Sequence, residues 1–184
     1  MKSEIELTDG NIVMRPCRLE DSAAVYKGVR ESIQELIKWA PWCYPGYSLS
    51  DCISWLSSRA RMWSESIEYD FVLFDTKSNA FLGGCVLDQI NRKNNFANLG
   101  YWVRTSRAGQ GIATAAVRLL SRFGFETLGF TRIEIVAAVP NKASQRVAEK
   151  AGAIREGVLR NRHVVRDKLY DSVLFSIVPQ DLRA

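Results

Sequence analysis

Residues 99–127 constrain this chain more than any other stretch, because they predict a strand, a loop with two glycines and a helix in direct succession. β-branched and aromatic residues end at Val103, Gly109 and Gly111 follow, and apolar residues then recur with helical spacing. The first N–H groups of a helix have no partner inside it and can bind a phosphate, and glycine lets such a ligand approach the backbone. The stretch therefore predicts a phosphate-binding loop, with a glycine-containing helix entry that binds nothing as the alternative.

Two common phosphate-binding motifs do not fit this loop. A Walker loop ends in Gly-Lys-Ser/Thr, and no lysine follows Gly111. A dinucleotide fingerprint has a third glycine where this chain has Thr114, although Glu134 lies at about the distance at which that fingerprint places an acidic residue. The loop also follows a series of antiparallel strands rather than a first parallel strand. Both motifs are therefore disfavoured.

A second set of elements follows, with a strand at 132–139, a helix at 143–151 that ends at Gly152, and a new strand after it. The two sets carry four ordered motifs: Tyr-Trp-Val from Tyr101, Gly-Gln-Gly-Ile-Ala from Gly109, Ala-Val-Pro-Asn-Lys-Ala-Ser from Ala138, and Lys-Ala-Gly-Ala from Lys150. These motifs resemble those of the GCN5-related N-acetyltransferases (GNAT), most of all the branch that acetylates the N-termini of ribosomal proteins. The resemblance covers nearly the whole chain.

The remaining elements suit a single α+β domain, residues 1–184. The pattern predicts a hairpin (4–7 and 12–15), a helix (21–39), a second helix capped by Ser50 (to about 66), three meandering strands (69–74, 81–89 and 96–103) and two closing strands (154–165 and 169–178). The resemblance implies the acyl-CoA N-acyltransferase (GNAT) fold. In that fold a mixed central sheet, antiparallel in its N-terminal part and with splayed strands, is flanked by helices.

Residues 39–47 are dense in aromatic residues and proline, with Trp39, Trp42, Tyr44 and Tyr47. Such a segment fits a loop whose rings pack against the core. It also fits one wall of an acceptor site, because rigid rings on a loop offer a large contact surface. In the resembled family the segment after the first helix helps to form the acceptor groove.

The resemblance implies that acetyl-CoA is the co-substrate and that the backbone holds it. The pantetheine arm would lie along the main chain of Trp102, Val103 and Arg104, and the pyrophosphate at Gly109, Gln110, Gly111, Ile112, Ala113 and Thr114. Asn141 would bind the pantetheine through its side-chain amide, or else cap the helix that follows. Ala108 stands where the family has arginine or glutamine, so a side-chain contact to phosphate is lost or is taken over by Arg107.

Ser144 is the candidate acid for the departing thiolate. Many members of the resembled family carry a tyrosine for this purpose seven residues after the asparagine, and this chain has Ala148 there. In the ribosomal-protein branch a serine three residues after the asparagine is proposed to assist the leaving thiol, and Ser144 matches it. Alternatively, Ser144 only satisfies free amides in the first turn of its helix.

His163, the only histidine, is the candidate general base. It lies on the strand where the resembled branch places a glutamate that is proposed as base, and an imidazole titrates near neutral pH. A carboxylate that acts through water, or no enzymic base at all, remains an alternative.

Composition excludes several other classes of protein. The chain has no apolar run of about 20 residues and no signal-peptide core, so we expect a cytoplasmic protein without a membrane role. Its four cysteines lack the spacing of a zinc site, which predicts free thiols and no metal. The net charge of +5 includes a basic cluster near the C-terminus but no nucleic-acid-binding motif. The excess of positive charge indicates either a solvated basic surface or a surface that attracts an acidic acceptor or the phosphates of the coenzyme.

We therefore expect an acetyl-CoA-dependent N-acetyltransferase that transfers the acetyl group directly to the α-amino group of a protein, ribosomal by resemblance. Two alternatives stay open: an enzyme for small amines such as polyamines or aminoglycosides, and an acyl-CoA-binding module without catalysis. Either a monomer or a homodimer is compatible with the sequence.

Overall fold

The computed structural model describes residues 5–183, in which helices flank one mixed sheet. The α-helices are α1 (Ser22–Trp39), α2 (Leu49–Ser64), α3 (Ile112–Glu126) and α4 (Lys142–Ala151). The strands are β1 (Leu7–Thr8), β2 (Ile12–Pro16), β3 (Tyr69–Asp75), β4 (Phe81–Asn91), β5 (Phe96–Val103), β6 (Arg132–Ala138), β7 (Ile154–Val165) and β8 (Lys168–Ile177). Short 3-10 turns lie at Leu19–Asp21, Thr105–Arg107 and Pro179–Arg183.

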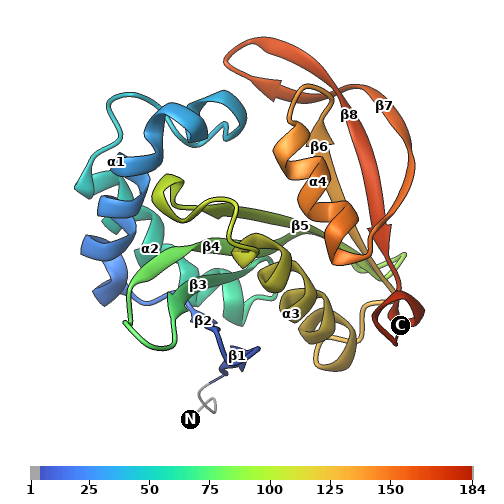
Figure 1. Cartoon of the computed structure of the whole chain (residues 1–184), viewed down its shortest axis with the longest axis horizontal. Coiled ribbons are helices and arrows are strands. Elements are labelled where there is room, and N and C mark those ends of the chain that lie inside the picture. Colours follow the sequence, from blue (N-terminus) through green and yellow to red (C-terminus); the bar gives the residue numbers. More distant parts are fainter. Residues whose placement is uncertain (1–4, 184) are drawn as a thin grey trace.

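The strands follow the order β1-β2-β3-β4-β5-β6-β8-β7 across the sheet (Figure 1). The first five strands are antiparallel neighbours, as short polar connections favour. β5 and β6 are parallel, and α3 makes the crossover between them. The predicted α+β class and the mixed sheet with an antiparallel N-terminal part are confirmed.

Two apolar clusters hold the helices against opposite faces of the sheet. One joins α3 and α4 to the centre of the sheet, with Leu120, Leu99 and Phe175 completely or almost completely buried. The other joins α1 and α2 to the strands β3 and β4, around Val29 and Val72. Burial of the apolar helix faces in these two clusters, rather than helix propensity alone, stabilises the four helices.

The predicted elements lie within a few residues of the observed ones, with one correction. α2 begins one residue before Ser50, and Ser48 is its cap. The Ser48 side chain accepts from the Asp51 amide, and the Asp51 carboxylate accepts from the Ser48 amide in return. This reciprocal pair satisfies two free amides, so it outcompetes a cap at Ser50. Residue 4 of the predicted hairpin lies outside the described residues.

No helix in residues 5–183 is long and apolar enough to cross a membrane.

Candidate functional site

The site is built around a parting of two central strands. β5 and β6 pair only from Phe96 to Asn98 and from Arg132 to Glu134. Beyond these residues the two strands are no longer paired, which confirms the predicted splay (Figure 1). The backbone of both strands therefore has free hydrogen-bonding groups along one side.

Of the three residues predicted beside pantetheine, Trp102 and Val103 end β5 and Arg104 follows it, and only Val103 has its amide on the splayed side. The Arg104 amide donates to the Leu82 carbonyl at 2.8 Å, so it points to β4. Hydrogen-bonding direction alternates along an antiparallel strand, so the Trp102 amide also points to β4 and the Val103 amide points away. The Trp102 side chain packs against the rings of Phe81 and Trp42, at centroid distances of 5.7 and 6.3 Å.

Glu31 on α1 holds the segment that leads from β5 to α3. Its carboxylate pairs with the Arg104 guanidinium and accepts from the Ser106 amide and hydroxyl, at 3.2 and 2.6 Å. The hydrogen bond from Arg104, followed by that from Ser106, lowers the pKa of Glu31 to about 2. Thr105 donates its amide to the Ser32 hydroxyl at 3.0 Å. The approach to the predicted phosphate loop is thus fixed to α1.

The loop itself has the geometry of an anion-binding turn. Gly109 and Gly111 have φ of +76° and +81°, and a Cβ added to either would meet no atom within 4 Å. α3 begins at Ile112 with no capping side chain from any described residue, whereas Asn141 caps α4. The free amides at the start of α3 and the open space before them fit a pyrophosphate group.

The other residues predicted at this loop have different surroundings. Gln110 is exposed, Ile112 is buried in the core, and Ala113 and Thr114 are half-buried in the first turn. A cavity of about 560 Å³ continues from Gly111 and Thr114 along α3. Its lining includes three cationic side chains, Arg118, Arg122 and Lys150. These charges suit the phosphates of a coenzyme.

Asn141 and Ser144 lie together at the start of α4, and Tyr101 of β5 contacts the same turn. The Asn141 side-chain oxygen accepts from the Ser144 amide at 3.2 Å, which is the capping role. The Tyr101 hydroxyl lies 2.9 Å from the Ser144 hydroxyl and 2.8 Å from its carbonyl oxygen. Burial raises the pKa of Tyr101 to about 12. Ala148, where the resembled family often has tyrosine, is fully buried.

The Tyr101 contact was missed from the sequence, where Tyr101 served only as part of a motif. The strand's alternation offered a signal, because Tyr101 shares a face with Leu99 and Val103, toward the cluster of α3 and α4. The partner 43 residues away could not be read from that alternation.

A protein-family profile described as an acetyltransferase (GNAT) domain matches residues 11–154. The chain belongs to this family. The match includes the splayed strands, the glycine loop and the start of α4.

Individual relatives of this GNAT chain match shorter stretches. YdaF of Bacillus subtilis is 40% identical over 95 residues, which cover 52% of this chain and 50% of YdaF. The ribosomal-protein-serine acetyltransferase of Escherichia coli is 32% identical over 103 residues, 56% of each chain. The chain thus matches about half the length of these relatives. Mycobacterium smegmatis RimJ, solved in complex with CoA-disulfide, superposes with a TM-score of 0.86 at 25% identity, over 98% of this chain and 89% of RimJ.

His163 of this GNAT domain lies on the hairpin of β7 and β8, whereas Ser144 lies on α4. Its Nε2 is 2.9 Å from the Trp39 carbonyl oxygen at the end of α1. A carbonyl only accepts, so Nε2 carries a hydrogen, and in the neutral form of the ring Nδ1 holds the lone pair. In the described part of the chain, no hydrogen bond joins His163 to Ser144 or Tyr101.

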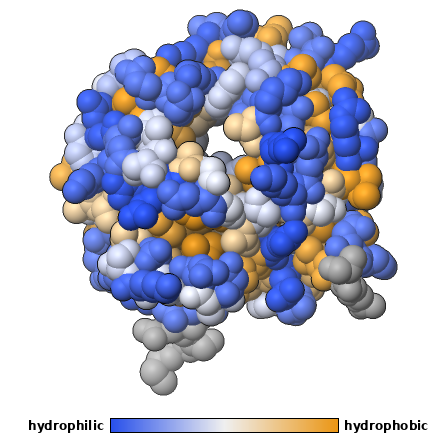
Figure 2. Space-filling view, viewed as in Figure 1, coloured by the Kyte–Doolittle hydropathy of each residue, from blue (hydrophilic) through white to orange (hydrophobic). Residues whose placement is uncertain are grey.

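The same hairpin contacts the segment after α1 at two further places. Arg166 donates to the Cys43 carbonyl at 3.4 Å, and the rings of Tyr170 and Trp39 lie 6.0 Å apart. We call these contacts, with that of His163, the hairpin bridge. Figure 2 shows a hollow in the molecular surface between the part that holds α1 and the part that holds α4. The bridge spans these two parts.

The aromatic segment at residues 39–47, which carries one end of the hairpin bridge, is partly packed against the core and partly exposed. Tyr47 is buried against the core, whereas Trp42 and Tyr44 are 47% and 44% exposed. The Trp42 ring lies 6.0 Å from Tyr47 and 6.3 Å from Trp102. The segment is therefore packed on one side and offers two rings on the other.

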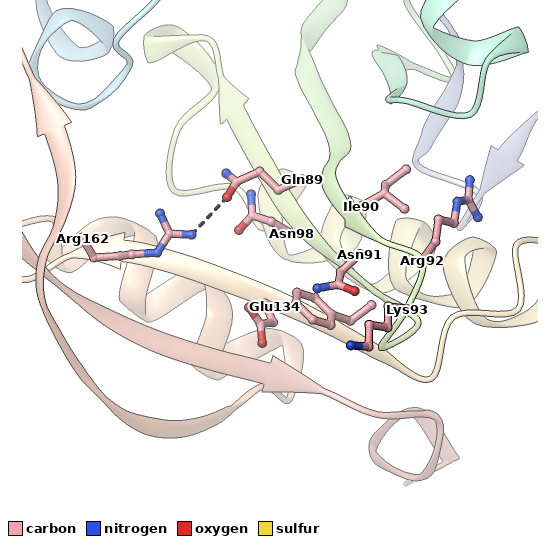
Figure 3. A pocket seen from close by; sticks show the side chains of 9 residues that line it. Gln89, Ile90, Asn91, Arg92, Lys93, Asn98, Glu134 and Arg162 are labelled. Atoms are coloured by element: carbon pink, nitrogen blue, oxygen red, sulfur yellow. Dashed lines mark hydrogen bonds between the residues drawn. The ribbon is translucent and has the colours of Figure 1, made fainter.

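A second cavity, of about 500 Å³, lies where β5 and β6 stop pairing (Figure 3). Its polar lining comes from β4, β5, β6 and β7, and includes Gln89, Asn98, Glu134 and Arg162. Arg162 reaches across from the hairpin and donates to the Gln89 side chain at 3.0 Å. The cavity thus joins the hairpin to the polar side of the central strands.

Proposed function

We propose that this chain is an acetyl-CoA-dependent N-acetyltransferase and that its acceptor is the α-amino group at the N-terminus of a protein. The splay, the uncapped start of α3 and the cationic cavity beside it support acetyl-CoA as donor, as does the CoA derivative in the RimJ complex. Acetyl-CoA would supply the thioester. The residues of this chain would hold it, position the amine and move protons.

The hairpin bridge is the observation that favours a chain end as acceptor. Its contacts join β7 and β8 to residues 39–43 across the hollow, through His163, Arg166 and Tyr170. A free N-terminus can enter beneath such a bridge, whereas the interior of a polypeptide cannot pass without the bridge opening. A long side chain or a small amine could also enter, so the experiment below includes both.

The polar cavity at the base of the splay is the proposed binding place for the first residues of the acceptor. Amide side chains such as Gln89 and Asn98 can pair with a peptide backbone. Glu134 lines the cavity and bonds to Arg132 at 2.8 Å, so it keeps a second oxygen for a positive amine. Asp88, whose pKa is raised by burial, bonds to Asn98 at 2.7 Å beside it.

The proposed roles follow from these positions. The Val103 amide and the amides at the start of α3 bind the coenzyme, and Ser144 donates a proton to the leaving sulfur. The Nδ1 atom of His163 takes a proton from the amine of the acceptor, through a water molecule. A carboxylate such as Asp88 is the competing base. The name of the E. coli relative supports a ribosomal acceptor, which would place the reaction in the cytoplasm.

The deciding experiment follows thiol release from acetyl-CoA with short peptides that begin with Ser, Ala or Met. Each peptide is tested with a free and with a blocked N-terminus. Further peptides offer only a lysine side chain, and polyamines are tested as small amines. Release with free N-termini alone is the expected result. Release with lysine side chains or polyamines would refute the α-amino assignment, and coenzyme binding without release over the whole panel would refute catalysis.

A pair of variants separates the two candidate bases. His163→Ala should lower the rate most at pH values below the pKa of the amine, where a base is needed most. Asp88→Asn should leave that part of the pH profile unchanged. The reverse result would assign the proton transfer to Asp88.

A further inference from the structure

Tyr101 connects β5, one of the two strands that part, to α4. It lies on β5, and its hydroxyl crosses to the first turn of α4. There it meets two oxygen atoms of one residue, the Ser144 carbonyl oxygen at 2.8 Å and the Ser144 hydroxyl oxygen at 2.9 Å. Nothing in the sequence motifs assigns a role to this side chain beyond the strand itself.

A phenol has one proton to donate, so Tyr101 can serve only one of these two oxygens at a time. If the proton goes to the carbonyl, the Ser144 hydroxyl donates its own hydrogen to Tyr101. If the proton goes to the Ser144 hydroxyl oxygen, the hydrogen of Ser144 is free for a third atom. The second arrangement leaves Ser144 able to donate.

We propose that Tyr101 is a positioning residue for Ser144: it donates to the Ser144 hydroxyl oxygen and so directs the hydrogen of that hydroxyl to the leaving sulfur. The inference rests on the proposed function of Ser144. Tyr101 is held for this task by the closely packed cluster that includes Leu99 and Ala148. Its hydroxyl stays protonated over any practical assay range, because burial raises its pKa to about 12.

The proton balance closes without an external reagent and without ionising Tyr101. After the C–N bond has formed, the C–S bond breaks and its electron pair goes to sulfur. Sulfur takes the proton of the Ser144 hydroxyl. The proton that the nitrogen must lose to become an amide passes through water to the Ser144 oxygen. It differs from the proton that His163 takes from the ammonium form of the amine before attack. Tyr101 donates a hydrogen bond to that oxygen throughout, which stabilises it while its own proton is away.

The test is a double-mutant cycle with Tyr101→Phe and Ser144→Ala, in which kcat and the KM for acetyl-CoA are measured separately. We expect Tyr101→Phe to lower kcat about 10-fold, the effect of one hydrogen bond, and to leave KM within about two-fold. We expect the double variant to have the kcat of Ser144→Ala, because Tyr101 acts only through Ser144. Phenylalanine keeps the ring, and a melting temperature for each variant verifies the fold.

Tyr69→Phe is the matched control. Tyr69 is a buried tyrosine of the same cluster, on β3, and within residues 5–183 its hydroxyl hydrogen-bonds only with Arg92, at 3.5 Å. We expect this variant to keep the wild-type kcat.

If the wild-type protein is active, three results would overturn the inference about Tyr101. These are a wild-type kcat for Tyr101→Phe, a raised KM with unchanged kcat, and independent effects that multiply in the double variant. The last two would mark Tyr101 as structural. A wild type that releases no thiol with any amine would instead overturn the proposed function, and this inference with it.

Discussion

Gly111→Ala separates the phosphate-binding role of the loop from its role in folding. Gly111 has φ of +81° and lies directly before α3, with open space where a Cβ would project. A left-handed conformation costs an alanine about 1–2 kcal/mol. In a chain of this size each kcal/mol lowers the melting temperature by roughly 2–4 °C. The new methyl group would also occupy space that we assign to the pyrophosphate.

Gly129→Ala provides the control, because Gly129 has φ of +72° and similar open space but lies in the turn between α3 and β6. Both variants should lose similar stability in thermal unfolding. Only Gly111→Ala should weaken acetyl-CoA binding. Loss of one hydrogen bond to a charged phosphate, about 1.5–3 kcal/mol, corresponds to a rise in KM and Kd of roughly 10- to 100-fold. Equal KM values for the two variants would refute the assignment of the loop to phosphate.

Three further predictions concern stability and the acceptor. Ser48→Ala removes the α2 cap and should cost about 1 kcal/mol in urea unfolding, with the KM for acetyl-CoA unchanged. Burial raises the pKa of Asp70 to about 6, so the stability that its protonation gives is present below pH 3.8 and is lost as the pH rises through about 6. Asp70→Asn should therefore flatten the pH dependence of the unfolding free energy over that range; an unchanged slope would contradict the raised pKa. Arg162→Gln, which alters the polar cavity, should raise the KM for the acceptor peptide several-fold, whereas Arg155→Gln, exposed on the same strand, should not.

Local patterns in the sequence were sufficient to predict the helices and strands and their order along the chain. Apolar spacing after Gly111 predicted α3, and the β-branched and aromatic residues up to Val103 predicted β5, because each pattern is local to one element. The cap of α2 was misplaced, since Ser48 and Ser50 look alike until the partner of each is known. Only the reciprocal bonds with Asp51 distinguish them.

Contacts between distant segments could not be predicted from such patterns. His163 and Trp39 are 124 residues apart, and Tyr101 and Ser144 are 43 apart. Their approach depends on how α1, α4 and the β7–β8 hairpin pack on the sheet, which no local periodicity encodes. The resemblance to a family supplied the candidates Ser144 and His163. It did not supply the hydrogen bonds that orient them.

The parting of β5 and β6 has a mechanical consequence for the whole sheet. Three residue pairs join the block β1–β5 to the block of β6, β8 and β7, whereas six pairs join β6 to β8. Apart from the two-residue edge strand β1, the β5–β6 boundary therefore has the fewest pairs in the sheet, and each block can open with few hydrogen bonds lost in the other. We expect amide hydrogen exchange to resolve two cooperative units that meet at Asn98 and Glu134, and a coenzyme seated in the seam to merge them into one.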